Sequence, residues 1–144
     1  MSNNPYQQYK QTQYETASQE QLLIMLYNGA IKFSQQAKQA LEEENVEESN
    51  EKLKRVQAII NELMVTLDME QGGEIADNLY SLYEYMNRRL IQANIRNDPE
   101  LVQEVLEMLK DLKDGWEQAL ESLKEEGQVG NNGNSENNSI NIQK

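Results

Sequence analysis

Apolar side chains return every three or four residues in four successive segments of this 144-residue chain. That spacing places them along one face of an α-helix, which turns once in 3.6 residues. We expect helices over about residues 19–43 and 47–69, a third that includes residues 75–93, and a fourth from Pro99 to near Glu126. The expected core stripes are Leu23, Leu26, Ala30, Phe33, Ala37 and Leu41; Leu53, Val56, Ile60, Leu63 and Leu67; Ile75, Leu79, Leu82, Met86, Leu90 and Ala93; and Val102, Val105, Leu109, Leu112, Trp116, Ala119 and Leu123.

Short connections with turn and capping signals separate these stripes. Ser18-Gln19-Glu20-Gln21 matches a capping box, and Glu42-Glu43-Glu44-Asn45 interrupts the apolar pattern. Gly72-Gly73 favours a turn, and Asp98-Pro99 is typical of a helix start. Because short connections make sequential helices antiparallel neighbours, the sequence predicts an all-α fold, an antiparallel up-down-up-down four-helix bundle.

Polar segments flank the expected bundle on both sides. Residues 1–17 are polar, Gln-rich and without a helical stripe, and we assign them to an N-terminal arm. Residues 18–126 form the bundle. Residues 127–144 are rich in Asn, Gly and Ser, a composition that buries too little apolar surface to fold, so they should form a disordered C-terminal tail.

The composition excludes several functional classes. The chain has no cysteine and no histidine, which removes disulfides, Cys/His zinc sites and His-based catalysis. Its net charge of −12 argues against nucleic acid and against anionic membrane surfaces, which attract basic proteins. No apolar run reaches the length of a signal-peptide core or a membrane span. We therefore expect a cytoplasmic protein with no cofactor and no membrane insertion.

An enzyme with paired carboxylates was the remaining catalytic alternative. Such chemistry needs a carboxyl group in an apolar setting that raises its pKa. Every expected core stripe is free of Asp and Glu. We therefore expect no enzymatic activity.

Two helices carry a second row of apolar residues beside the main stripe. In the first helix the row is Ile24, Tyr27 and Ile31. In the third helix it is Ala76, Tyr80, Tyr83 and Ile91. Two interpretations remain open: neighbouring helices and the arm cover these rows, or the rows line grooves that receive amphipathic helices of another protein.

Two adjacent arginines follow the third-helix aromatics. Arg88 could pair with Glu84 one turn earlier, a weak surface contact. Arg89 has Tyr85 at that spacing and no acidic residue within a turn, so any ion pair it makes must cross to another helix or chain. Arg88 also lies beside Ile91, which keeps it among the candidate partner contacts.

The ordered set of segments resembles the flagellar secretion chaperone family FliS over about residues 4–120. Each segment is weakly diagnostic alone, but their order and spacing together are highly specific. The segments are Asn4-Pro5-Tyr6-Gln7-Gln8-Tyr9, Thr16-Ala17-Ser18, the run from Leu22 to Ala30, Gly72-Gly73-Glu74-Ile75-Ala76, Tyr83-Glu84-Tyr85-Met86-Asn87-Arg88-Arg89-Leu90, Ala93-Asn94-Ile95, Asn97-Asp98 and Trp116.

The resemblance implies a non-catalytic export chaperone that binds the C-terminal helical segment of flagellin and prevents its premature polymerisation. It also implies contacts with an export-gate component and flagellar regulators, and an arm that occupies part of the site in the absence of cargo. The alternative is a regulatory adaptor of flagellar assembly that binds another flagellar protein. The expected partner-binding residues are Tyr6, Tyr9, Ile24, Tyr27, Ile31, Tyr80, Tyr83, Arg88 and Ile91.

The chain departs from the family pattern at two positions. Asn87 stands where an apolar or aromatic residue is common, on the row with Tyr83 and Ile91. Gln19 occupies the first helical position, where proline is frequent. The first departure affects the expected binding surface, and the second affects the junction between the arm and the first helix.

Overall fold

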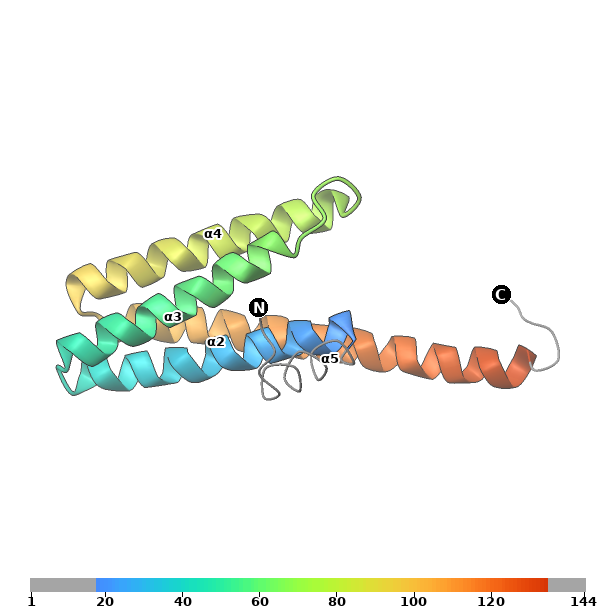
Figure 1. Cartoon of the computed structure of the whole chain (residues 1–144), viewed down its shortest axis with the longest axis horizontal. Coiled ribbons are helices and arrows are strands. Elements are labelled where there is room, and N and C mark those ends of the chain that lie inside the picture. Colours follow the sequence, from blue (N-terminus) through green and yellow to red (C-terminus); the bar gives the residue numbers. More distant parts are fainter. Residues whose placement is uncertain (1–17, 135–144) are drawn as a thin grey trace, which may run out of the picture. The chain divides into compact units, whose positions relative to one another are not determined.

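The computed structural model describes residues 18–134 and consists there of four helices with no strand (Figure 1). They are α2 (Gln19–Glu42), α3 (Val46–Val65), α4 (Gly73–Arg96) and α5 (Pro99–Asn134). A first compact unit extends to Asp111, and a second begins at Leu112. Within the first unit successive helices alternate in direction (Figure 1). The predicted all-α, up-down-up-down architecture is confirmed.

Side chains at the helix starts hold the backbone as the sequence predicted. The Ser18 hydroxyl accepts from the Gln21 amide at 3.0 Å, and the Gln21 side chain accepts from the Ser18 amide at 3.1 Å. Asn45 caps α3 by accepting from the Glu48 amide at 3.1 Å. These contacts satisfy amides that have no partner inside the helix.

The turn between α3 and α4 differs from the predicted one. α3 ends at Val65 rather than near residue 69, and an Asp68 carboxylate oxygen accepts from the Glu70 and Gln71 amides at 3.2 and 3.1 Å. Gly72 then comes so close to the Asp68 carbonyl that a Cβ atom would lie 2.5 Å from it. The glycine is required by this close approach, and its neighbour begins α4 instead of ending α3.

The end of α5 also differs from the prediction. The helix continues to Asn134 instead of ending near Glu126. Each residue added to an existing helix gains one further hydrogen bond. This gain offsets the low helix propensity of the glycines and asparagines in the last turns of α5. The arm (1–17) and residues 135–144 lie outside the described residues, so the predicted division into arm, bundle and tail stays a prediction.

The core of the first unit includes two tyrosines that the sequence placed beside the main stripes. Tyr27 is 0% exposed and Tyr83 1% exposed, whereas Ile75 and Leu82 from the expected third stripe are 69% and 37% exposed. The expected stripes are confirmed at Leu79, Met86, Leu90 and Ala93 of α4 and at Ala30, Ala37 and Leu41 of α2, which are all buried. The prediction was wrong in leaving the two tyrosines beside the core and in placing Ile75 and Leu82 inside it. A tyrosine ring can be buried fully when its hydroxyl finds a partner, which sequence spacing does not reveal. The largest fully buried side chains are those of Tyr27, Tyr83, Leu53, Ile60, Leu63, Met86, Leu90, Leu109, Val56, Val102, Val105 and Ser34.

No helix within residues 18–134 combines the length and apolar character that crossing a bilayer requires.

Candidate partner-binding surface

The hydroxyl groups of Tyr27 and Tyr83 meet inside the core at 2.5 Å, joining α2 to α4. Burial is the main cause that raises the pKa of Tyr83 far above its usual value, and the hydrogen bond to Tyr27 raises it further. The pair is therefore neutral at physiological pH. Because neither ring reaches solvent in this conformation, these two predicted contact residues lie beneath the surface rather than on it.

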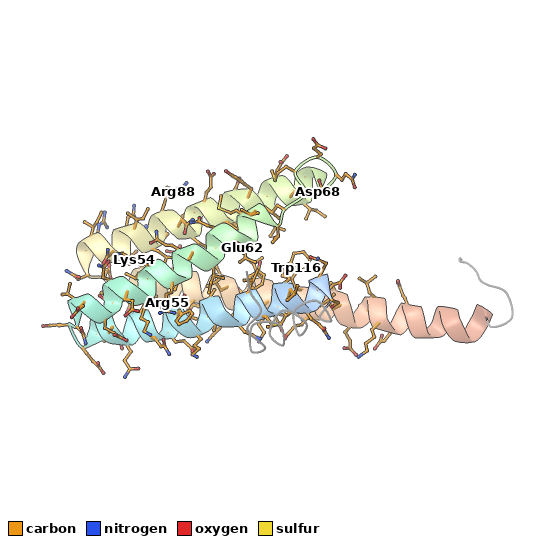
Figure 2. All side chains as sticks on the ribbon, in the orientation of Figure 1. Lys54, Arg55, Glu62, Asp68, Arg88 and Trp116 are labelled. Carbon is orange, nitrogen blue, oxygen red and sulfur yellow. The ribbon has the colours of Figure 1, made fainter. Side chains whose placement is uncertain are left out.

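The other predicted residues of the two rows reach the surface to different extents. Ile24 and Ile31 are half-buried, one turn before and one turn after Tyr27 on α2. Tyr80 is half-buried on α4, and Ile91 is 48% exposed. Arg88 is exposed and points outward from α4 (Figure 2). The predicted arm residues Tyr6 and Tyr9 lie outside the described residues.

Exposed isoleucines continue along the C-terminal half of α4. Ile95 follows Ile91 by one turn and is 75% exposed. Side-chain amides bridge the neighbouring seam between α4 and α3: Asn87 donates to Asn61 at 3.0 Å, and Asn94 donates to Asn50 at 3.1 Å. The α4 surface next to α3 thus alternates between apolar side chains and amides that hold the two helices together.

Arg89 pairs across helices, as predicted. Its Nε donates to Glu104 of α5 at 2.8 Å, and its NH1 donates to Gln92 at 2.8 Å. The Tyr85 hydroxyl donates to the second oxygen of the same carboxylate. Hydrogen bonds from Tyr85 and then Arg89 lower the pKa of Glu104, so the carboxylate is charged and connects α4 to α5.

Arg88 makes a different contact from its neighbour. Its guanidinium carbon lies 5.9 Å from the centre of the Tyr85 ring, a cation–π distance. Within the described part of the chain it forms no ion pair with Glu84. Its charge is therefore available at the surface beside Ile91.

A cavity beside the first turns of α2 was missed by the sequence analysis. Its volume is about 590 Å³, and apolar side chains of α2 make up most of its lining. The sequence assigned Leu23 and Leu26 to the core, but both are only half-buried. The available signal was that α2 is apolar nearly all round from Leu22 to Tyr27. The lining residues are Gln19, Glu20, Leu22, Leu23, Met25, Leu26, Glu62 and Thr66.

Nearer the C-terminal end of α2, three cations surround the ring of Phe33. The charged groups of Lys32, Lys52 and Arg55 lie 5.9, 5.5 and 5.3 Å from the ring centre. Figure 2 labels Arg55 and Glu62, which both project from α3. The Phe33 cluster, defined as Phe33 and these three cations, thus gathers positive charge from both α2 and α3.

Metal chemistry has no site in the described part of the chain. No group of three or more acidic side chains there comes close enough together to hold an ion. What the arrangement offers instead is exposed apolar surface on helices, with charged groups beside it, which suits the binding of another helix.

Known proteins with the same sequence pattern are flagellar chaperones. Residues 2–123 match the family described as Flagellar protein FliS. The chain is 43% identical to the flagellar secretion chaperone FliS of Bacillus subtilis strain 168 over 119 residues, covering 83% of this chain and 88% of the relative. It is 44% identical to the protein of the same name from Salmonella typhimurium over 104 residues, covering 72% of this chain and 77% of the relative.

A solved structure agrees with these similarities in fold. It is described as a flagellar chaperone from bacteria and aligns at a TM-score of 0.69, over 81% of this chain and 95% of its own, with 22% sequence identity. The relatives are named chaperones, and FliS is a family of chaperones and not of enzymes. The matches in sequence cover most of both proteins, and the chain therefore belongs to the FliS family of flagellar secretion chaperones.

Proposed function

We propose that this protein binds the C-terminal helical segment of a flagellin in the cytoplasm and keeps it competent for export. The observation that carries this proposal is the apolar surface of α4, where Ile91 and Ile95 are 48% and 75% exposed. Burying an aliphatic side chain of this size is worth about 1.5–3 kcal/mol, so a partner helix that covers them gains free energy. The name that the relatives share, secretion chaperone, supports an exported flagellar protein as the partner.

The proposed surface uses the residues that the two rows bring outward. Tyr80, Arg88 and Ile91 would contact the partner from α4, and Ile24 and Ile31 from α2. Tyr27 and Tyr83 would support this surface from beneath through their hydrogen bond. Tyr6 and Tyr9 of the arm would add contacts or occupy the surface until cargo displaces them.

In the proposed mechanism, the chaperone surface covers apolar stripes of its flagellin partner. As the family resemblance implies, flagellin's terminal segment would carry apolar stripes that belong in the filament core. Free stripes of this kind would pair between monomers and start polymerisation. Held against the bundle, they cannot pair. Ordering a disordered segment costs about 2–5 kcal/mol or more, so the complex needs a large interface. The loaded chaperone would then pass its cargo to a component of the export gate, and flagellar regulators could use the unloaded surface.

Titration calorimetry with a peptide from the C-terminal segment of the cognate flagellin tests the proposal. We expect saturable one-to-one binding with a negative heat-capacity change, the mark of buried apolar surface. Ile91→Glu should weaken binding at least about tenfold, since it places a charge where an apolar contact is made. Met69→Glu is the matched control, because Met69 is 45% exposed in the turn before α4, at the opposite end of that helix from Ile91.

Absence of binding by a folded, monodisperse sample would contradict the proposal. The alternative would then be the regulatory adaptor, with a different flagellar protein as its partner. Equal weakening by Ile91→Glu and Met69→Glu would instead show that the peptide binds elsewhere on the chain.

A further inference from the structure

Two pairs of side-chain amides fix the register of α3 against α4 on the surface that carries Ile91. Asn94 of α4 donates to Asn50 of α3 at 3.1 Å, and Asn87 of α4 donates to Asn61 of α3 at 3.0 Å. Asn87 and Asn94 are two turns apart, so the bridges bound a stretch of surface about 10 Å long. Because both bridges join the same two helices, they determine which side chains face each other between them.

Lys54 of α3 and Ile91 of α4 lie between the two bridges. Lys54 follows Asn50 by one turn, so the two side chains share a face of α3. Ile91 precedes Asn94 by one turn and shares a face of α4 with it in the same way. Since the helices run in opposite directions, the bridge between Asn50 and Asn94 places Lys54 across from Ile91.

A second cation borders Ile91 on its own helix. Arg88 precedes Ile91 by one turn, which makes the two side chains neighbours on the α4 surface. Arg88 and Lys54 are both exposed, and Figure 2 labels them on α4 and α3. Ile91, which is 48% exposed, therefore has a guanidinium group and an ammonium group beside it. These three residues are called the Ile91 patch below.

The charge of Lys54 is not neutralised by its own helix. The acidic residue nearest to it along α3 is Glu51, whose carboxylate pairs with Arg55 at 3.3 Å. Within residues 18–134 Lys54 forms no ion pair. Its ammonium group is therefore available to a carboxylate from outside.

The charge of Arg88 is available for a similar reason. Residues 85–97 contain three arginines and no acidic residue, although the whole chain carries a net charge of −12. The nearest carboxylate of α5, that of Glu104, pairs with Arg89 at 2.8 Å. Glu84 lies one turn before Arg88 but forms no ion pair with it in the described part of the chain. The Ile91 patch is thus apolar at its centre and positive at its edges.

We propose that Lys54 and Arg88 select the cargo by its charge: the segment that covers Ile91 carries an acidic side chain beside its apolar contact, and this carboxylate lies between the two cations. This role rests on the proposed function, because it takes the exported flagellar protein as the occupant of the surface. It adds the chemistry that the occupant must present. Covering Ile91 removes water from Lys54 and Arg88, and a cation that loses water without gaining a partner opposes binding. A segment without carboxylates would leave both cations in that state.

Titration calorimetry with two peptides tests the role of the two cations. The first peptide is the C-terminal segment of the cognate flagellin. The second is the same peptide with every Asp replaced by Asn and every Glu by Gln, which removes the charges and keeps the shapes. The measured quantity is the ratio of the two dissociation constants for one protein. Comparing this ratio between protein variants cancels the repulsion that the chain's net charge exerts on any acidic peptide.

Lys54→Gln/Arg88→Gln removes both positive charges from the Ile91 patch. The preference for the acidic peptide should be about fivefold smaller in this variant than in the wild type, because each exposed charge pair changes affinity by up to severalfold. Each single variant, Lys54→Gln or Arg88→Gln, should lose part of the preference. The wild-type preference should also shrink as salt rises from about 0.05 to about 0.5 M, since salt screens exposed charges.

Lys32→Gln/Lys110→Gln is the matched control. Both lysines are exposed and form no ion pair within the described residues, and they lie on α2 and α5. This variant changes the net charge by the same amount as Lys54→Gln/Arg88→Gln but leaves the Ile91 patch intact. Its preference for the acidic peptide should equal that of the wild type.

Four results would overturn the selection of cargo by charge. An unchanged preference in Lys54→Gln/Arg88→Gln would do so while leaving the proposed function intact, provided that Ile91→Glu still weakens binding. An equal loss in the control variant would assign the preference to net charge alone. Absence of binding by both peptides would contradict the proposed function as well. Co-sedimentation of the wild type with phosphatidylglycerol vesicles, lost in Lys54→Gln/Arg88→Gln, would assign the two cations to a lipid surface instead.

Discussion

Among single-residue contacts, the buried hydrogen bond between the Tyr27 and Tyr83 hydroxyl groups joins α2 to α4. Tyr83→Phe keeps the ring and removes this hydrogen bond, so we expect the free energy of unfolding to fall by about 1 kcal/mol. Urea denaturation followed by circular dichroism measures the change. Tyr80→Phe is the matched control on the same helix: its hydroxyl forms no hydrogen bond within the described residues, and the change should stay within about 0.5 kcal/mol. Equal losses in both variants would contradict a specific role for the pair.

The stability difference between wild type and Tyr83→Phe should also depend on pH. The unfolded chain ionises Tyr83 near its ordinary pKa of about 10, whereas burial and the bond to Tyr27 raise the pKa in the folded protein. The contribution of Tyr83 to stability is therefore fully present below pH 10 and is lost as the pH rises toward the folded pKa. Tyr83→Phe lacks this loss. The difference in stability between wild type and variant should be constant from pH 7 to 9 and should shrink above pH 10.

At the scale of helices, α4 is connected to α5 through Glu104, whose carboxylate accepts hydrogen bonds from both Tyr85 and Arg89 of α4. The pKa of Glu104 is lowered by these contacts, so its contribution to stability is present above the unfolded pKa and is lost as the pH falls through the folded pKa. Glu104→Gln should lower the urea midpoint modestly at pH 7, because the group is partly exposed and screened by solvent. The difference from wild type should begin to shrink at about pH 4, close to the unfolded pKa, and should vanish once the pH is below the lowered folded pKa.

Glu107→Gln is the matched control for this helix pair. Glu107 accepts from Gln103 at 3.0 Å within α5, so its replacement disturbs no contact between helices. We expect the midpoint at pH 7 to move less than in Glu104→Gln. A larger effect of Glu107→Gln would show that the connection between α4 and α5 does not depend on the Glu104 carboxylate.

The number of residues that separate two contacting groups in the sequence explains which features could be predicted. The Ser18 cap was predictable because its partner is three residues away. That Arg89 must pair outside its own helix followed from the absence of acidic neighbours, but its partner depends on the register of α4 against α5. The burial of Tyr27 depends on a hydroxyl 56 residues away, so the sequence placed Tyr27 and Tyr83 beside the core stripes rather than in the core.

On the candidate surface, too, local features were predicted and features that depend on helix packing were not. Sequence spacing predicted apolar residues beside the main stripe of α4, and Ile91 is indeed exposed. The cavity beside the first turns of α2 was missed because the exposure of Leu26 depends on how α3 packs against α2. The cations around Phe33 come from both helices, a grouping that no local pattern reveals.

For the whole molecule, the core ends well before the chain does. Leu109 is the last of the fully buried large side chains in the described residues, and the first compact unit ends at Asp111. A chain of residues 1–111 therefore keeps every one of these side chains. We expect it to unfold in a single cooperative urea transition, because a complete core is what cooperative unfolding requires.

The cost of the truncation can be compared with the cost of a cavity in the full chain. Leu53 is 1% exposed, and Leu53→Ala should lower the free energy of unfolding by about 2–5 kcal/mol. Because the truncation to residues 1–111 removes no fully buried side chain, its cost should be smaller than that of Leu53→Ala. A truncated protein with a broad, non-cooperative transition would mean that residues from Leu112 onward contribute to the core. The first unit would then not be the folding unit of this chaperone, and α5 would stabilise it along more of its length than residues 99–111.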